Sequence, residues 1–256
     1  MEDKIITLQY CSDLHLEFLD NQYYLEDHPI QPKADTLILA GDILTLSKLS
    51  KFDWFLDDVS EKFKQVFWIP GNHEYYGSEI GSRSGAFKET IRENVFLLNN
   101  QMVEIDGVGL IFTTLWSRLS QENQGQITTS LNDFRRIRKD GRALSADHYN
   151  AMHGENLKFL EKSLENGPDK KVVITHHVPT FHNYPVKYLG DVLNEAFAVD
   201  LGELMKKHAP NYWIYGHHHF NTAPFKIGET TLLSNQLGYV MMEEHHQFST
   251  EAVLEL

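Results

Sequence analysis

The sequence predicts an α/β protein in which short buried strands alternate with amphipathic helices. Stretches lying between several of the expected strands have helical spacing of apolar residues, at 48–64, 150–165 and 191–208. The apolar runs typical of buried strands are residues 6–11, 36–41, 66–71, 95–100, 108–114, 171–176, 212–217 and 230–235. In the second half the strands follow one another closely without helices, which predicts antiparallel additions to the sheet.

Length and composition favour one domain. A chain of 256 residues with 41% hydrophobic residues can bury a substantial core, so we predict a single domain over 1–256. The segment 117–149, rich in Gln, Asn, Ser and Arg, is the best candidate for an insertion or lid.

The net charge and the length of the apolar segments indicate which partners and which cellular location to expect. The formal net charge of −13 disfavours an extended nucleic acid as partner. The apolar runs are too short to span a bilayer, so we expect no membrane partner. The acidic start of the chain resembles no secretory signal, and the lone Cys11 cannot form an internal disulfide, so we expect a cytoplasmic protein.

The first three expected strands each end in residues that can bind a metal ion. Asp13 and His15 form a D-x-H pair after the first strand, and strand alternation would turn both side chains the same way. Asp42 follows Gly41 after the second strand. Asn72 and His73 lie in a G-N-H-E turn after the third, where the simpler interpretation of Asn72 is a helix N-cap.

The two later strand ends carry histidines. The first is T-H-H-V-P, which contains His176 and His177, and the second is G-H-H-H, which ends at His219. Alternation puts His217 and His219 on one side and turns His218 away. Open α/β sheets place their ligand sites at the carboxyl ends of strands, so the five motifs predict one shared site. Mixed oxygen and nitrogen ligands suit Mn²⁺, Fe or Zn²⁺.

The order D-x-H, G-D, G-N-H-E, H-H-x-P and G-H-x-H resembles the calcineurin-like metallophosphoesterase superfamily. The motifs run from residue 13 to residue 219 and so cover most of the chain. The resemblance implies a four-layer α/β/β/α sandwich with two divalent or mixed-valence metal ions at the strand ends. The reaction it implies is hydrolysis of a phosphoester by a hydroxide that bridges the two ions.

The resemblance also implies a role for each motif residue. Asp42 would bridge both ions, and His73 would stabilise the phosphoryl oxygens and act as general acid. The ligands of the first ion would be Asp13, His15 and His219, and those of the second Asn72, His176 and His217. Glu74 is expected to orient the turn rather than to bind metal.

Residues outside the ligand set are weaker candidates for contact with a substrate. The stretch from Ser117 to Arg142 has six basic residues against three acidic ones, which fits either a solvated face or a phosphate-attracting lip. Asn132 and Asp133 could position a substrate. The residues we select as substrate contacts are His177, Arg118, Arg135 and Arg136.

The motifs narrow the substrate class. The second motif reads GDILTLS over 41–47 and lacks the D-R-G of the protein serine/threonine phosphatases, while the third is GNHE rather than the GNRD of the lipid A pathway hydrolases. The chain most resembles the cyclic-nucleotide-phosphodiesterase-like group, so we expect a small phosphodiester or phosphomonoester as substrate. Alternatives are a protein phosphatase-like or nuclease activity at the same site, or a non-catalytic metal-binding scaffold. The sequence leaves the oligomeric state open.

Overall fold

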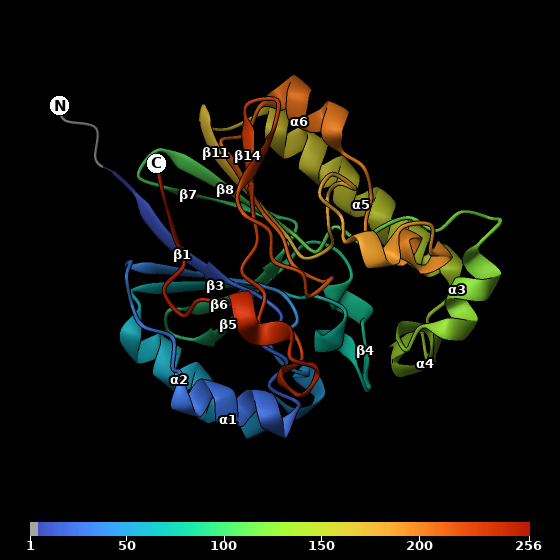
Figure 1. Ribbon diagram of the computed structural model, residues 1–256, viewed down its shortest axis with the longest axis horizontal. Coiled ribbons are helices and arrows are strands. Elements are labelled where there is room, and N and C mark those ends of the chain that lie inside the picture. Colours follow the sequence, from blue (N-terminus) through green and yellow to red (C-terminus); the bar gives the residue numbers. More distant parts are fainter. Residues whose placement is uncertain (1–4) are drawn as a thin grey trace.

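The computed structural model describes residues 5–256 and contains two six-stranded sheets that pack face to face (Figure 1). The first sheet joins strands of the N-terminal part of the chain to its last strand. Its order is β15 (Val253–Glu255), β1 (Thr7–Cys11), β2 (Thr36–Ala40), β3 (Gln65–Ile69), β6 (Val95–Asn99) and β5 (Phe87–Arg92). The second sheet has the order β13 (Phe225–Ile227), β14 (Thr230–Leu233), β12 (Tyr212–Ile214), β11 (Lys170–Thr175), β8 (Val108–Thr113) and β7 (Gln101–Ile105).

Both sheets have a parallel centre and antiparallel edges. In the first, β1, β2, β3 and β6 run parallel, and in the second β8, β11, β12 and β14 do so. The outer strands β15, β5, β7 and β13 are antiparallel to their neighbours. Central strands such as β2 are buried along their whole length, as expected of parallel strands covered on both faces, whereas β7 alternates between half-buried and exposed positions. The expected antiparallel additions in the second half are present only in part: β13 and β15 are antiparallel, but the predicted strands at 212–217 and 230–235 contain β12 and β14, which pair parallel.

Helices cover the outer face of each sheet, which gives four layers (Figure 1). Alternate side chains of β2 pack on opposite faces of the sheet. Leu37 and Leu39 pack under the helices, while Ile38 and Ala40 pack between the two sheets. The helices α1 (Leu19–Asp27) and α2 (Asp53–Lys62) cover the first sheet, and α5 (Ala146–Glu165) and α6 (Gly202–His208) cover the second. The α/β sandwich implied by the sequence is confirmed.

The helix predictions were correct in place and wrong in extent. The expected helix 48–64 is divided into a 3₁₀ helix and α2, and 191–208 is divided into η5 and α6. Ser145, whose side chain accepts from the backbone N–H of His148 at 3.2 Å, starts α5 four residues earlier than predicted. The 3₁₀ helices are η1 (Leu46–Phe52), η2 (His73–Tyr75), η3 (Gly81–Arg83), η4 (Val186–Tyr188), η5 (Val192–Ala196), η6 (Val240–Met242) and η7 (Glu244–Gln247).

The segment 117–149 lies beside the sandwich and carries its own small elements (Figure 1). It contains α3 (Gln124–Ser130), α4 (Asp133–Arg136), β9 (Ile137–Lys139) and β10 (Arg142–Ala143), and β9 also pairs with β4 (Ser78–Glu79). A separate apolar cluster that includes Trp116, Phe134 and Tyr149 attaches the segment to the sandwich. No helix of residues 5–256 combines the length and the apolar character needed to cross a membrane.

Candidate metal centre

Loops that follow neighbouring strands of both sheets meet at one edge of the sandwich. The backbone N–H of Asp13 donates to Gly41 O at 2.9 Å, and that of His15 donates to Asp42 O at the same distance. Across the two sheets, Ser12 pairs with Gln236 in a parallel bridge. These contacts hold the loops in register beyond the strand ends, where the candidate ligands lie.

Five expected ligands have a backbone conformation that is uncommon for residues other than glycine. Their φ angles are 56° for Asp13, 46° for His15, 55° for Asp42, 81° for His217 and 49° for His219. Strand alternation was therefore the wrong reason for expecting the D-x-H pair and the two outer histidines to converge. The left-handed backbone turns these side chains inward, and such conformations concentrate at functional sites.

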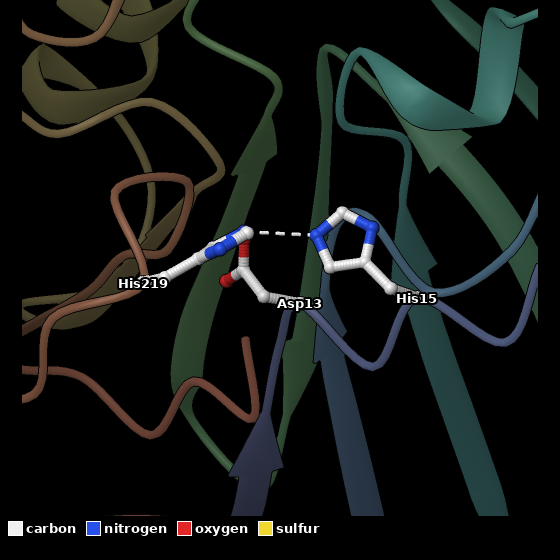
Figure 2. A group of neighbouring side chains, drawn as sticks. All are labelled: Asp13, His15 and His219. Atoms are coloured by element: carbon white, nitrogen blue, oxygen red, sulfur yellow. Dashed lines mark hydrogen bonds and ion pairs between the residues drawn. The ribbon is translucent and has the colours of Figure 1, made fainter. Parts of the chain in front are cut away.

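The first expected ligand set comes together. The ligand atoms of Asp13, His15 and His219 all lie within 4.8 Å of one another. His15 Nε2 is 2.8 Å from His219 Nε2, which in turn is 3.5 Å from Asp13 Oδ1 (Figure 2). Two imidazole nitrogens and a carboxylate oxygen thus face one small volume, as a cation requires.

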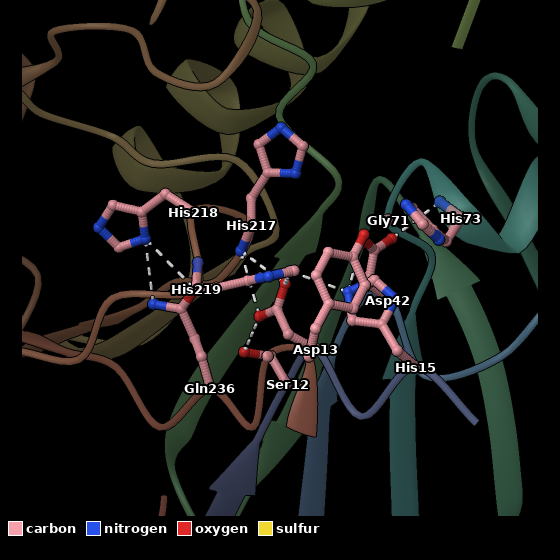
Figure 3. A network of polar contacts seen from close by, with 12 residues as sticks. Ser12, Asp13, His15, Asp42, Gly71, His73, His217, His218, His219 and Gln236 are labelled. Atoms are coloured by element: carbon pink, nitrogen blue, oxygen red, sulfur yellow. Dashed lines mark hydrogen bonds and ion pairs between the residues drawn. The ribbon is translucent and has the colours of Figure 1, made fainter. Parts of the chain in front are cut away.

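The second set meets in the same way around Asp42. The ligand atoms of Asp42, His176 and His217 lie within 4.8 Å of one another, with His176 Nε2 3.4 Å from Asp42 Oδ2 and 3.1 Å from His217 Nδ1. The same Asp42 oxygen is 3.7 Å from His15 Nε2 of the first set. Asp42 therefore lies between the two groups, the position that a bridging ligand needs (Figure 3).

Asn72 is the remaining residue expected in the second set. Its side-chain N–H₂ donates to Asp133 Oδ1 at 2.9 Å and to the Tyr76 hydroxyl at 3.3 Å. Its Oδ1 is buried and has no hydrogen-bond partner among the described residues. A buried amide oxygen without a partner is costly, and a cation at this position would satisfy it. Asn72 is at the N-cap position of η2, but its side chain caps no backbone N–H, so the simpler interpretation of this residue as a helix cap is not supported.

Hydrogen bonds on the far side of each ring orient the histidines. His15 Nδ1 lies 3.2 Å from Glu17 Oε1, His219 Nδ1 lies 2.8 Å from Glu244 Oε2, and His176 Nδ1 lies 3.0 Å from Ala40 O. Partners of this kind fix the tautomer and leave the other ring nitrogen to the metal. The sequence analysis overlooked both glutamates, although the position of Glu17 two residues after the D-x-H pair was a usable signal.

Gly71 and Glu74 shape the third turn. A Cβ on Gly71 would lie 2.2 Å from Asp42 Oδ1 and 2.5 Å from His176 Nε2, so only glycine fits beside the site. The buried carboxylate of Glu74 accepts from the backbone N–H groups of Asp42, Ile43 and Gly71 at 2.7–2.9 Å. Glu74 therefore ties the loops that follow β2 and β3 together, and both of its oxygens accept from backbone N–H groups.

His73 lies beside the metal groups and lines a cavity. Its Nδ1 is 2.6 Å from Glu17 Oε1, and its backbone N–H donates to Asp42 Oδ1 at 2.8 Å. Burial opposes the charged form of this ring, but the carboxylates of Asp42 and Glu17 outweigh it and raise the pKa of His73. The ring is thus held by one nitrogen, which leaves Nε2 to act on a substrate.

The cavity next to the two groups has a volume of about 370 Å³. Arg136 lines it, and its guanidinium stacks on Tyr76 at 4.7 Å from the ring centre. Asn132 and Asp133 line it too, so the segment 117–149 forms part of its wall.

Three of the four expected substrate contacts lie elsewhere. Arg118 and Arg135 are exposed residues outside the cavity wall, and the guanidinium of Arg135 donates instead to Thr129 O. His177 is fully buried behind the site, where its ring packs on His217 with the centres 4.2 Å apart. His218 points away from both groups, as expected, and lies 3.2 Å from Gln236 Oε1 (Figure 3).

Comparison with known proteins identifies the family. The family model for calcineurin-like phosphoesterases matches residues 8–221. An uncharacterised protein of Acanthamoeba polyphaga mimivirus is 31% identical over 274 aligned residues, which cover 97% of this chain and 96% of the viral protein. An acyl-carrier-protein phosphodiesterase of Mycobacterium tuberculosis is 39% identical over 71 residues, which cover 27% of this chain and 21% of that protein.

Solved structures share the fold. The crystal structure of a phosphopantetheinyl hydrolase from Mycobacterium tuberculosis superposes with a TM-score of 0.72, covering 99% of this chain and 96% of that one. Sequence identity in this superposition is 15%, so the likeness shows the fold alone.

Proposed function

Because this chain belongs to the calcineurin-like phosphoesterase family, we propose that it hydrolyses a small phosphodiester or phosphomonoester with two metal ions and a histidine general acid. The observation that carries the proposal is the pair of ligand groups that share Asp42, with His73 at the edge of the adjoining cavity.

The residues present fit two cations. We assign Asp13, His15 and His219 to one ion, Asn72, His176 and His217 to the other, and Asp42 to both. The partnerless Oδ1 of Asn72 and the imidazole nitrogens that face one another support this assignment. When bound, two such ions supply Lewis-acid activation of the phosphoryl group and of the attacking water. Mn²⁺, Fe and Zn²⁺ all suit these ligands.

His73 is proposed to protonate the leaving group. In the reaction the attacking water releases one proton to solvent and its oxygen forms a bond to phosphorus. The bond from phosphorus to the leaving oxygen breaks, and His73 Nε2 transfers its proton to that oxygen. Glu17 holds Nδ1–H at 2.6 Å and so keeps the ring directed toward the cavity. Help of this kind is typically worth about 10²–10⁴-fold in rate.

A phosphodiester is the first substrate class to test. The relative from Mycobacterium tuberculosis that shares a 71-residue region with this chain is named as a phosphodiesterase. A diester carries a single negative charge, which suits a cavity where Arg136 is the lone arginine or lysine among the described lining residues. We propose a cytoplasmic enzyme, in keeping with the absence of a disulfide.

The decisive assay compares leaving groups. The Mn²⁺-loaded protein is expected to hydrolyse both 4-nitrophenyl and alkyl phosphodiesters. His73→Ala should lower kcat about 10²–10⁴-fold for the alkyl leaving group and much less for 4-nitrophenolate, which needs no proton, while metal content is retained. Equal losses for both leaving groups would refute the general-acid role.

The competing hypothesis is that the protein is a non-catalytic scaffold. It predicts no turnover with any divalent ion, together with protein-partner binding that is unchanged after metal removal. Retention of His73, which is not among the proposed ligands of either ion, at the edge of the cavity argues for an enzyme.

A further inference from the structure

Aromatic and aliphatic side chains line one wall of the cavity, starting next to the metal groups. Phe197 stacks on His217 with ring centres 4.5 Å apart and an interplanar angle of 25°. Leu193, Tyr188 and Tyr184 continue this wall from the segment that follows β11, and Leu131 faces the cavity from the segment 117–149. Apolar side chains thus adjoin a ligand of the second ion directly.

Exposed apolar residues flank this wall along the chain. Tyr184 contacts Tyr188 and Phe181 with ring centres 6.5 Å and 5.4 Å apart. Next to Tyr188, Val186 is 81% exposed and Leu189 is 67% exposed, and Val186 is the most exposed large hydrophobic side chain among residues 5–256. Because Val186 and Leu189 flank the cavity residue Tyr188 in the chain, their exposed apolar side chains are candidates for a binding surface beside the cavity.

The carboxylates that line the cavity contact other protein groups. Asp133 accepts from Asn72 and Tyr76, Glu244 contacts His219, and Asp191 accepts from the backbone N–H of Leu193. Arg136 is the lone arginine or lysine in the described lining. An arm with further phosphates or carboxylates would meet four carboxylates in the lining, those of Asp42, Asp133, Asp191 and Glu244. These outnumber the two cations, Arg136 in the lining and Lys187 over the Tyr188 ring, and so disfavour a charged arm.

We propose that this wall binds an uncharged apolar arm of the phosphoester substrate, which runs from Phe197 past Tyr184 and Tyr188 to rest on Leu189 and Val186. This inference rests on the proposed function and defines its substrate class. A cavity of about 370 Å³ lies within the range of small-molecule sites and accommodates a phosphoryl group with a short chain. Both alkyl chains and aryl groups satisfy this chemistry.

The size of the effect follows from the apolar surface that the arm buries. Complete burial of one CH₂ group changes a binding constant by about fourfold, so a partly buried chain should gain roughly twofold per CH₂. This gain should end where the chain extends beyond Leu189.

The test is a chain-length series with the Mn²⁺-loaded, full-length protein. Methyl, ethyl, butyl and hexyl 4-nitrophenyl phosphodiesters should show kcat/KM rising roughly twofold per CH₂, mainly through KM. A phenyl ester distinguishes an aryl from an alkyl preference, and an arm of equal length ending in a carboxylate should bind at least tenfold more weakly than its apolar counterpart. A flat series, or a carboxylate arm preferred to an apolar one, would overturn the proposal.

Surface variants locate the subsite. Leu189→Ser should lower the hexyl-to-methyl ratio of kcat/KM several-fold, and Leu189→Met should restore it. Ile5→Ser is the matched control, because Ile5 is also 67% exposed but precedes β1 at the opposite end of the strands from the metal groups. An unchanged ratio in Leu189→Ser would remove this residue and the surface path from the proposal.

A binding series separates this inference from the proposed function. Calorimetry with a series of alkylphosphonates, from methylphosphonate to hexylphosphonate, measures how binding affinity depends on chain length without turnover. If affinity rises with chain length but no ester is hydrolysed, the apolar subsite is supported and the proposed enzymatic function is refuted. If esters are hydrolysed but affinity does not change with chain length, the enzymatic function is supported and the subsite is refuted.

Discussion

Glu17 connects a proposed metal ligand to the proposed general acid. One carboxylate oxygen lies 2.6 Å from His73 Nδ1 and 3.2 Å from His15 Nδ1. The pKa of Glu17 is lowered to about 2, because its bonds and charge interactions with the two rings outweigh the burial of the carboxylate. A single ionised group can therefore set the orientation of both rings.

We predict that Glu17→Gln lowers kcat about 10–100-fold for alkyl leaving groups and far less for 4-nitrophenolate, because His73 loses its anionic partner. The measurement is the ratio of the two rates. Glu244→Gln is the matched control, since it removes the partner of His219 and should weaken metal retention without changing that ratio. An unchanged ratio in Glu17→Gln would leave Glu17 without a role in positioning His73.

Asp42 is the residue on which both metal groups depend. Its Oδ2 is 3.4 Å from His176 Nε2 and 3.7 Å from His15 Nε2. We predict that Asp42→Asn lowers bound Mn²⁺ from about two ions per chain to one or fewer, as measured by elemental analysis, because an amide supplies only one neutral ligand oxygen. His218→Gln should retain both ions. Full occupancy in Asp42→Asn would refute the bridging assignment.

At the scale of elements, α4 contacts the metal centre although it lies in the segment 117–149. Asp133 at its start accepts from the Asn72 side chain, and Arg136 at its end stacks on Tyr76. These contacts decide which end of the Asn72 amide faces the histidines. The segment thus contributes to the site through a ligand's orientation as well as through the cavity wall.

We predict that Asp133→Ala weakens the affinity of one Mn²⁺ ion about 10–100-fold, because the Asn72 amide loses the acceptor that orients it. Titration followed by electron paramagnetic resonance measures this directly. Asp191→Ala, which removes another carboxylate of the cavity wall without touching a proposed ligand, should leave both affinities unchanged. Equal affinities in the two variants would contradict the orienting role.

At the scale of the molecule, the proposed ions join the two sheets. Asp13, Asp42 and Asn72 follow strands of the first sheet, whereas His176 and His217 follow strands of the second. The shared core between the sheets supplies most of the contact, but the carboxylates of Asp13 and Asp42 are buried at the edge. Cations there would neutralise them and tie the layers together.

Metal removal is therefore expected to destabilise the fold. One ion at 1,000 times its Kd contributes about 4 kcal/mol, which corresponds to roughly 8–16 °C in Tm for a chain of this size, and two ions contribute about twice as much. Chelation should lower Tm by about this amount, and Mn²⁺ should restore it. Asp42→Asn should show a smaller difference between loaded and chelated protein, and an unchanged Tm in the native chain would contradict the ligand assignment.

The sequence by itself determined the layered α/β class, the central strands and the candidate ligands. Buried parallel strands give continuous apolar runs such as 36–41, and in this chain these runs are followed by polar motifs. It missed α1 and edge strands such as β5 and β7, whose half-exposed alternation leaves a weaker signal. The convergence of Asp13 with His15 and of His217 with His219 was expected from strand alternation, and Asp42 was expected at a strand end, but only the tertiary structure brings the five together. The left-handed backbone at each of these residues is held by contacts between loops far apart in the chain. The same holds for Glu17, for Asp133 and for the cavity wall at Tyr184 and Leu189, since long-range packing decides which side chains share a site.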